Sequence, residues 1–144
     1  MLVQIPVPPT RGYLNFGDIM IFTSALLFGR IVGGLAGGIG SALADIITGY
    51  GYFAPYTLII KGLEGFLAGA IRDGKSTQRD VLGWFVGALV MVTGYFLAEA
   101  YAMGLGVPTA LVEAPGNTVQ VLSGAIVAIP LARGLRNRIP KILV

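Results

Sequence analysis

Five charged side chains lie within stretches of sequence that are otherwise apolar: Asp18, Asp45, Lys61, Glu64 and Glu99. An ionisable group is costly in hydrocarbon, so it is retained where it has an ionic partner, a water-filled cavity or a ligand. A pocket that combines one amine with carboxylates, amides and tyrosines suits a small polar organic ligand. The chemistry that these residue types favour is therefore capture of a ligand, provided that the chain brings them together.

The composition indicates an integral membrane protein. Of the 144 residues, 55% are hydrophobic and 12% are charged, and the mean hydropathy is +0.79. An average soluble domain has about 25% charged residues. The 22 glycines fit transmembrane helices that pack closely through small residues. There is no cysteine and no histidine, which excludes disulfides, thiolate or imidazole catalysis and Cys/His metal sites.

The predicted fold is an all-α polytopic bundle, a single membrane domain over residues 1–144. Runs of about 17–25 apolar residues are long enough to cross a bilayer. The predicted spans cover approximately residues 16–29, 31–50, 55–71, 81–103 and 117–135. Thr77 and Asp80 resemble a capping box that opens the fourth helix, and Pro108 and Pro115 bound a loop before the fifth.

The basic residues predict the orientation in the membrane. They cluster at residues 72–79 and 133–141, which fall on the same side if the five spans alternate. That side is cytoplasmic by the positive-inside rule, in the plasma membrane of a prokaryote. Such short clusters do not indicate nucleic-acid binding. The chain would then begin outside without an export signal, and Met1–Ile5 resembles the end of a helix, so we expect a missing first span. The alternative is a five-span protein whose short N-terminus crosses unaided.

This orientation places the buried charges at similar depth. Lys61 and Glu64 fall in the outer half and near the middle of the third span. Glu99 lies near the outer end of the fourth span, with Tyr95 one turn below it on the same face. The inner halves of the spans are almost purely apolar. A site that opens to the outside is therefore favoured over a conduit through the membrane.

The polar residues also have structural interpretations as helix caps. Asn117 and Gln120 have the spacing of a capping box at the start of the fifth span. Asn15 and Asp18 have the same spacing at the start of the first.

Other interpretations concern ion pairs and the membrane interface. Lys61 could pair with Glu64 or neutralise Asp45, and Glu99 could be solvated at interface depth. Aromatic residues near helix ends more often form an interfacial belt than a binding site. Here they are Tyr13, Tyr50, Tyr52, Phe53, Tyr56 and Tyr101.

Small residues recur at helical spacing in the second span. Gly33, Gly37 and Ser41 follow one another every four residues and predict a face for close helix packing. The glycine-rich run is not a phosphate loop, because it lacks the Gly-Lys-Ser/Thr ending and lies within an apolar span.

Three classes of function fit a small membrane protein of this kind. An intramembrane enzyme is the weakest, since there is no histidine, no cysteine and no paired carboxylate metal motif. A stand-alone ion-coupled carrier needs alternating access, yet the polar groups are confined to one leaflet and no inverted repeat is visible. A substrate-binding subunit that is powered by a partner needs only an outward site, and the sequence favours it.

Four stretches, in this order along the chain, resemble a known family. They are residues 12–18 (GYLNFGD), 36–45 (AGGIGSALAD), 58–65 (LIIKGLEG) and 115–120 (PGNTVQ). The chain resembles the S components of energy-coupling factor (ECF) transporters, specifically the riboflavin-type family. The resemblance implies six helices, so this chain departs from it by lacking most of the first helix, and with it the small-residue motif that docks against the T subunit.

The resemblance also implies function and site residues. It implies an outward pocket for a water-soluble vitamin or precursor, with a riboflavin-like ligand favoured. The loop between helices one and two would close this pocket. The motor would be a transmembrane T subunit with two cytoplasmic ABC ATPases, and no cofactor is implied. Asp18 and Asp45 are interpreted as structural, and Glu64 as either structural or binding. The candidate lid and pocket residues are Asn15, Lys61, Tyr95, Glu99, Asn117 and Gln120.

Overall fold

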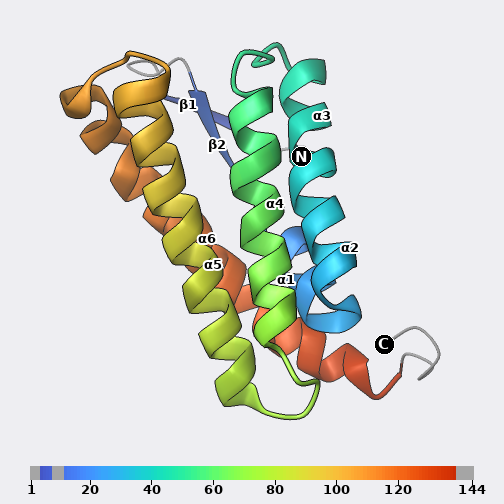
Figure 1. The fold of residues 1–144 in the computed structure, drawn as a ribbon. Coiled ribbons are helices and arrows are strands. Elements are labelled where there is room, and N and C mark those ends of the chain that lie inside the picture. Colours follow the sequence, from blue (N-terminus) through green and yellow to red (C-terminus); the bar gives the residue numbers. More distant parts are fainter. Residues whose placement is uncertain (1–3, 8–11, 139–144) are drawn as a thin grey trace.

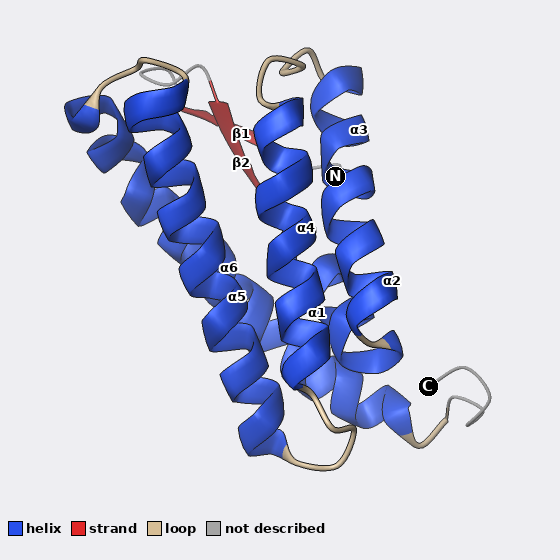
Figure 2. Cartoon of the chain, viewed as in Figure 1, coloured by secondary structure: helices blue, strands red, loops and turns tan. Residues whose placement is uncertain are grey.

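Five helical stretches and one short β-hairpin make up the computed structural model, which describes residues 4–7 and 12–138 (Figure 1). The hairpin pairs β1 (Gln4–Val7) with β2 (Gly12–Asn15) in antiparallel register. The helical stretches are α1 (Gly17–Phe28), α2–η1–α3 (Arg30–Leu35, Ala36–Gly40, Ser41–Ile47), α4 (Ala54–Ile71), α5–η2 (Thr77–Leu97, Ala98–Ala102) and α6 (Val107–Arg136). The segments η1 and η2 are π-helical turns within longer helices. Helices dominate the fold (Figure 2), which confirms the predicted class.

The outer surface of the bundle is apolar. Arg30–Ile47, Thr77–Ala102 and Val107–Arg136 are long and apolar enough to cross a membrane, and Gly17–Phe28 is a shorter apolar helix. Large aliphatic side chains point away from the bundle; Ile47 is 81% exposed and Ile126 is 73% exposed. Such a surface suits lipid rather than water. The chain is a membrane helical bundle.

Helix α4 is central to the packing. It contacts α1, α2, η1, α3 and α5, whereas α1 also contacts α6 (Figure 1). Small apolar clusters fill the bundle on the side away from the hairpin. One joins Phe22, Ala68 and Ala128, and the other joins Leu26 and Ala132. The helix that carries Lys61 and Glu64 therefore has neighbours on most sides, which is why its polar residues are buried.

The turn between α1 and α2 depends on a glycine. Gly29 has φ = 87°, in the region that residues with a Cβ avoid, and its N–H donates to the carbonyl of Ala25 at 2.9 Å. This turn reverses the chain within one residue. It brings α2 alongside α4 and so determines where the polar residues of α3 will lie.

The predicted start of the last helix is wrong. Helix α6 begins at Val107, not at Asn117, and continues through Pro115. Pro108 occupies the first turn, where its missing N–H is not needed. An internal proline is tolerated in membrane helices because neighbouring groups satisfy the freed carbonyl. Asn117 and Gln120 are consequently in the helix interior, and their interpretation as an N-terminal capping box is also wrong.

The N-terminal segment differs from the expectation too. Met1–Ile5 was predicted to be the end of a helix, but Gln4–Val7 is a β-strand; residues 1–3 lie outside the described part. Strand β2 runs directly into α1, so the hairpin lies over the end of the bundle where α1 begins (Figure 1).

A polar cluster closes the opposite end of the bundle. The carboxylate of Asp80 is fully buried and pairs with Arg136 at 3.1 Å. Arg136 and Arg72 donate to the carbonyl of Leu26, at 3.2 and 3.1 Å, which satisfies an acceptor in the last turn of α1. The interpretation of Asp80 as a capping residue with Thr77 is therefore wrong: α5 begins without a side-chain cap, and Asp80 ties α5 to α6.

We expect Asp80→Asn to destabilise the protein by about 2 kcal/mol. It removes the charge that partners Arg136 but keeps one hydrogen-bond acceptor, so the cost is below that of a fully broken buried pair. The measurement is the apparent melting temperature of the purified protein in detergent. The control is Asp73→Asn in the exposed turn, where the remaining oxygen still accepts from the N–H groups of Lys75 and Ser76. Equal shifts in the two variants would contradict the role of the buried pair.

Candidate ligand-binding site

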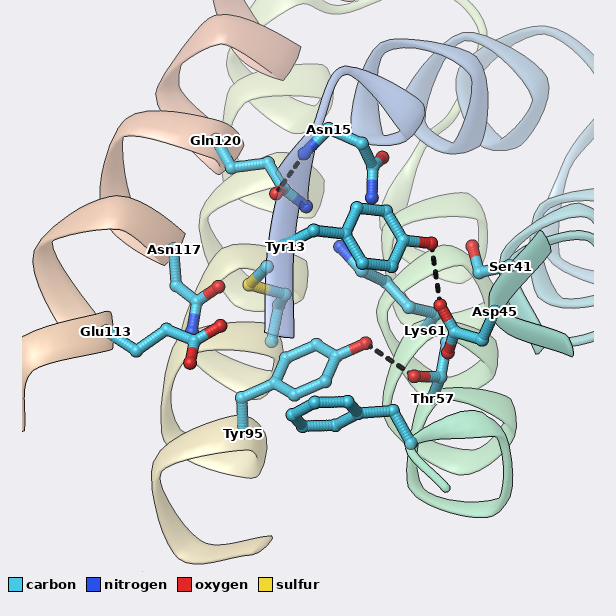
Figure 3. A pocket seen from close by; sticks show the side chains of 12 residues that line it. Tyr13, Asn15, Ser41, Asp45, Thr57, Lys61, Tyr95, Glu113, Asn117 and Gln120 are labelled. Carbon is cyan, nitrogen blue, oxygen red and sulfur yellow. Dashed lines mark hydrogen bonds between the residues drawn. The ribbon is translucent and has the colours of Figure 1, made fainter. Parts of the chain in front are cut away.

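A pocket lies beneath the hairpin, between α3, α4, α5 and α6 (Figure 3). The helical residues that line it recur at spacings of three and four within each helix, so each set shares one face. The twelve lining residues are Tyr13, Asn15, Ser41, Asp45, Phe53, Thr57, Lys61, Met91, Tyr95, Glu113, Asn117 and Gln120. Four segments that are distant in sequence thus present polar and aromatic faces to one space.

An ionic cluster lies behind one side of this pocket and reaches its lining through Lys61 and Gln120. The ammonium of Lys61 is in ion-pair contact with Asp18 and lies 3.1 Å from Glu64. The amide nitrogen of Gln120 also donates to Asp18, at 3.1 Å. The side chains of Lys61, Asp18 and Glu64 are at most 4% exposed. Buried charges of this kind are stable only when paired, so the cluster joins α1, α4 and α6 through charge neutralisation.

These contacts decide between the alternative roles of Asp18 and of Lys61. Asp18 does not cap α1, because its carboxylate faces Lys61 and Gln120. Lys61 pairs with Glu64, as one alternative had it, but no ion pair joins it to Asp45 among the described residues.

The hairpin is fastened over the pocket on two sides. The hydroxyl of Tyr13 donates to Asp45 on α3 at 2.7 Å, and the backbone N–H of Asn15 donates to Gln120 on α6 at 3.0 Å (Figure 3). Burial and the hydrogen bond to Asp45 raise the pKa of Tyr13 above its ordinary value, so the hydroxyl stays protonated and donating. The side chain of Asn15 accepts from the N–H of Gly17 at 2.6 Å, which fixes the step from strand to helix.

We expect Tyr13→Phe to loosen the hairpin without unfolding the bundle. It removes one hydrogen bond, worth about 1 kcal/mol, while the ring remains to pack 4.5 Å from that of Tyr50. Hydrogen exchange followed by mass spectrometry should show exchange of the Gly12–Asn15 amides about 5-fold faster. Tyr101→Phe, at a tyrosine that is 68% exposed, is the matched control. Unchanged exchange in Tyr13→Phe would mean that this bond does not hold the hairpin.

Tyr95 forms the opposite aromatic wall. Its hydroxyl shares a 2.9 Å hydrogen bond with Thr57, and its ring lies 5.9 Å from the ammonium of Lys61. Tyr95 packs against the buried apolar cluster of Ala88, Met91 and Val121. A planar ligand in the pocket would meet the face or edge of Tyr95 on one side and the hairpin on the other (Figure 3).

Most of the predicted site residues lie in this pocket. The predicted residues that line it are Asn15, Lys61, Tyr95, Asn117 and Gln120. Glu64 lies behind the lining as a partner of Lys61. Glu99 is fully buried in η2 and is not solvated, but it is not among the lining residues. Asp45, expected to be structural, contributes to the lining and holds the hairpin.

Several lining residues were not predicted as site residues. Phe53 and Thr57 precede the predicted residue Lys61 by eight and four positions, a helical spacing that can be read from the sequence. Glu113 precedes Asn117 by four residues, but the predicted loop at Pro115 hid this helical face. Tyr13 was assigned to an interfacial belt, and nothing in its local sequence indicates contact with Asp45.

The pocket is narrow in this structure. The space between the lining side chains is about 30 Å³. Ligand pockets for drug-sized molecules measure roughly 300–1,000 Å³. The lining side chains must therefore move apart before a ring compound can occupy the pocket. Within the described residues, no three acidic side chains are grouped so as to hold a metal ion.

Comparison with known proteins identifies the family. Residues 1–137 match the family described as "ECF-type riboflavin transporter, S component". The chain belongs to this family. The family consists of transporter subunits rather than enzymes, and the predicted family is confirmed.

Individual relatives extend this match. A Pyrococcus woesei protein titled "Uncharacterized protein in gap 3'region" is 49% identical, over 99% of this chain and 95% of its own length. The thiamine precursor transporter HmpT of Lactococcus lactis is 33% identical, over 88% of this chain and 72% of its own length. A UPF0397 protein of Streptococcus pneumoniae is 30% identical, over 74% of this chain and 56% of its own length. The chain is thus similar both to a family described for riboflavin and to a relative that is named for a thiamine precursor.

Proposed function

We propose that this protein is the membrane-embedded subunit that captures a water-soluble vitamin or vitamin precursor for an ECF-type importer. The observation that carries the proposal is the pocket under the hairpin, in which polar residues from α3, α4, α5 and α6 converge within a membrane bundle. Asn117 and Gln120 supply amide groups, and Tyr95 supplies a ring for a planar ligand. Riboflavin and a thiamine precursor are the two ligands to which the names of the family and of one relative refer.

The inner half of the bundle supports capture rather than conduction. Beyond the ionic cluster, Phe22, Ala25, Ala68 and Ala128 are fully buried and pack together. A polar solute could not cross this apolar core without a large rearrangement of the helices. We propose that a transmembrane T subunit and two cytoplasmic ABC ATPases drive this rearrangement.

The orientation of the pocket follows from the distribution of basic residues. The basic residues of the described part lie away from the hairpin, in the turn after α4 and the start of α5 (residues 72–79) and at the end of α6 (residues 133–138) (Figure 1). If these basic clusters face the cytoplasm of a prokaryotic cell, the hairpin and the pocket face the outside. The pocket would then meet its ligand outside the cell and would have to present it to the cytoplasm with the help of the motor.

Equilibrium binding to the detergent-purified protein tests the capture function. A panel of thiamine, riboflavin, pantothenate and biotin should include at least one ligand with submicromolar affinity, about −8 kcal/mol or stronger. The double variant Asn117→Ala with Gln120→Ala should weaken that affinity at least 10-fold. Asn137→Ala, at an exposed position beyond α6, is the control and should bind normally.

Transport assays separate this proposal from a stand-alone carrier. In liposomes, we expect uptake to require the T subunit, the ATPases and ATP. Uptake by the protein alone, driven by a proton or sodium gradient, would contradict the proposal and favour an ion-coupled carrier. Absence of binding to every vitamin in the panel would contradict the capture function itself.

A further inference from the structure

We propose that a groove on the outer surface of the bundle binds an anionic phospholipid. The groove lies between α2 and α4, which run side by side (Figure 1), and its volume is about 420 Å³. It shares no residue with the pocket under the hairpin, so the inference is separate from the capture function. The residues that line the groove are all apolar or glycine: Ile31, Gly34, Leu35, Leu58, Ile59, Gly62, Leu63 and Phe66.

Two glycines give the groove its depth. A Cβ added at Gly34 on α2 would lie 3.5 Å from the carbonyl oxygen of Gly62 on α4, so the two backbones approach closely here. The aliphatic side chains on either side stay exposed: Ile31 by 60% and Ile59 by 63%. A recess between such side chains offers close van der Waals contact to a slender hydrocarbon chain. The groove is therefore complementary to the acyl chain of a lipid.

The length of the groove matches one leaflet of a bilayer. On α4 its lining runs from Leu58 to Phe66, and eight steps of helix make about 12 Å. The hydrocarbon core of a bilayer is about 30 Å thick, so one leaflet contributes about 15 Å. A transmembrane helix of a partner protein would need a track about twice as long as this groove. An acyl chain that enters from one membrane surface fits its length better.

A cationic side chain marks one end of the groove. The guanidinium carbon of Arg30 lies 5.9 Å from the centroid of the Phe66 ring. Arg30 is exposed, and no carboxylate pairs with it in the part of the chain that the structure describes. Arg72, by contrast, already donates to the carbonyl of Leu26 at 3.1 Å. A guanidinium presents paired N–H donors that match phosphate oxygens, so Arg30 can hold the phosphodiester of a lipid.

The surroundings of Arg30 favour a lipid with net negative charge. Gly29, just before Arg30, touches the end of α4: a Cβ added at Gly69 would lie 2.5 Å from the carbonyl carbon of Gly29. The basic turn of residues 72–79 follows α4 directly, so Arg30 lies at the basic end of the bundle. Basic groups at a membrane surface attract anionic lipids. A zwitterionic headgroup brings its own cation and gains less from this position.

Native mass spectrometry of the delipidated protein tests this site. Phosphatidylglycerol and phosphatidylcholine with the same acyl chains are added in turn, and we expect the first phosphatidylglycerol to bind about 5-fold more tightly. Arg30→Gln should abolish this preference. Arg133→Gln, at an exposed arginine on α6, is the matched control and should retain it. Leu63→Trp, which places a larger side chain in the groove, should weaken both lipids about 3-fold.

Three results would overturn the proposal. Equal affinity of the unaltered protein for the two lipids would show that the site does not select an anionic headgroup. Equal losses in Arg30→Gln and Arg133→Gln would show a diffuse attraction to the basic end of the bundle. If Leu63→Trp binds both lipids normally but no longer assembles with the T subunit, the groove takes a partner helix instead. Vitamin binding should be unchanged in Arg30→Gln, because Arg30 does not line the pocket under the hairpin.

Discussion

Lys61→Met is expected to destabilise the protein by about 3–5 kcal/mol, because it leaves Asp18 and Glu64 buried without a cation. Methionine keeps the length and most of the volume of the lysine stem. The loss of stability therefore reflects the missing charge and not a cavity. Asp18 and Glu64 are fully buried, and water cannot easily compensate them. The measurement is the apparent melting temperature in detergent together with the fraction of protein that elutes as a single folded species.

Two comparisons make this prediction specific. Lys75→Met in the turn after α4 removes an equal charge where water is present, and should shift the melting temperature little. Combining Lys61→Met with Asp18→Asn removes one of the stranded carboxylates and should recover part of the lost stability, whereas two independent losses would add. A double variant less stable than Lys61→Met would show that the ion pair does not account for the effect.

The helical spans and most of the candidate site could be predicted from the sequence. Apolar runs bounded by Arg30, by the Gly49–Gly51 turn and by Arg72 gave helix limits close to those of α1 to α4. The cost of a charge in hydrocarbon was sufficient to single out Lys61, which does line the pocket. The helix limits and the burial cost of Lys61 each depend on one segment of the chain, so neither requires knowledge of how the segments pack together.

The partners of these residues could not be predicted in the same way. The ion pair of Lys61 with Asp18 and the bond of Tyr13 to Asp45 join different elements and depend on how those elements pack. Glu113 was missed because Pro115 normally ends a helix in water, whereas a membrane bundle tolerates it. The sequence therefore indicated which residues are costly to bury, and the packing decided which groups compensate them.

Gly37 lies where α2–η1–α3 packs closely against α4, and adding a side chain there should strongly destabilise the protein. A Cβ at Gly37 would overlap the carbonyl oxygen of Lys61 and lie 2.9 Å from its carbonyl carbon. These are backbone atoms in the middle of a helix, so they cannot rotate away as a side chain would. We expect Gly37→Ala to push α4 away and to cost about 3 kcal/mol, at the upper end of overpacking effects. The displaced backbone carries Lys61, so vitamin binding should weaken as well.

Gly40→Ala is a closely matched control for Gly37→Ala. Both glycines belong to the π-helical turn η1, but a Cβ at Gly40 would have no atom within 4 Å. Alanine is favoured over glycine in helices by about 1 kcal/mol, so Gly40→Ala should be neutral or stabilising. Melting temperatures and vitamin affinities of the two variants test this contrast directly. Equal losses would show that η1 needs glycine for its own π-helical geometry. A loss confined to Gly37→Ala would show that contact with α4 holds Lys61 in the pocket.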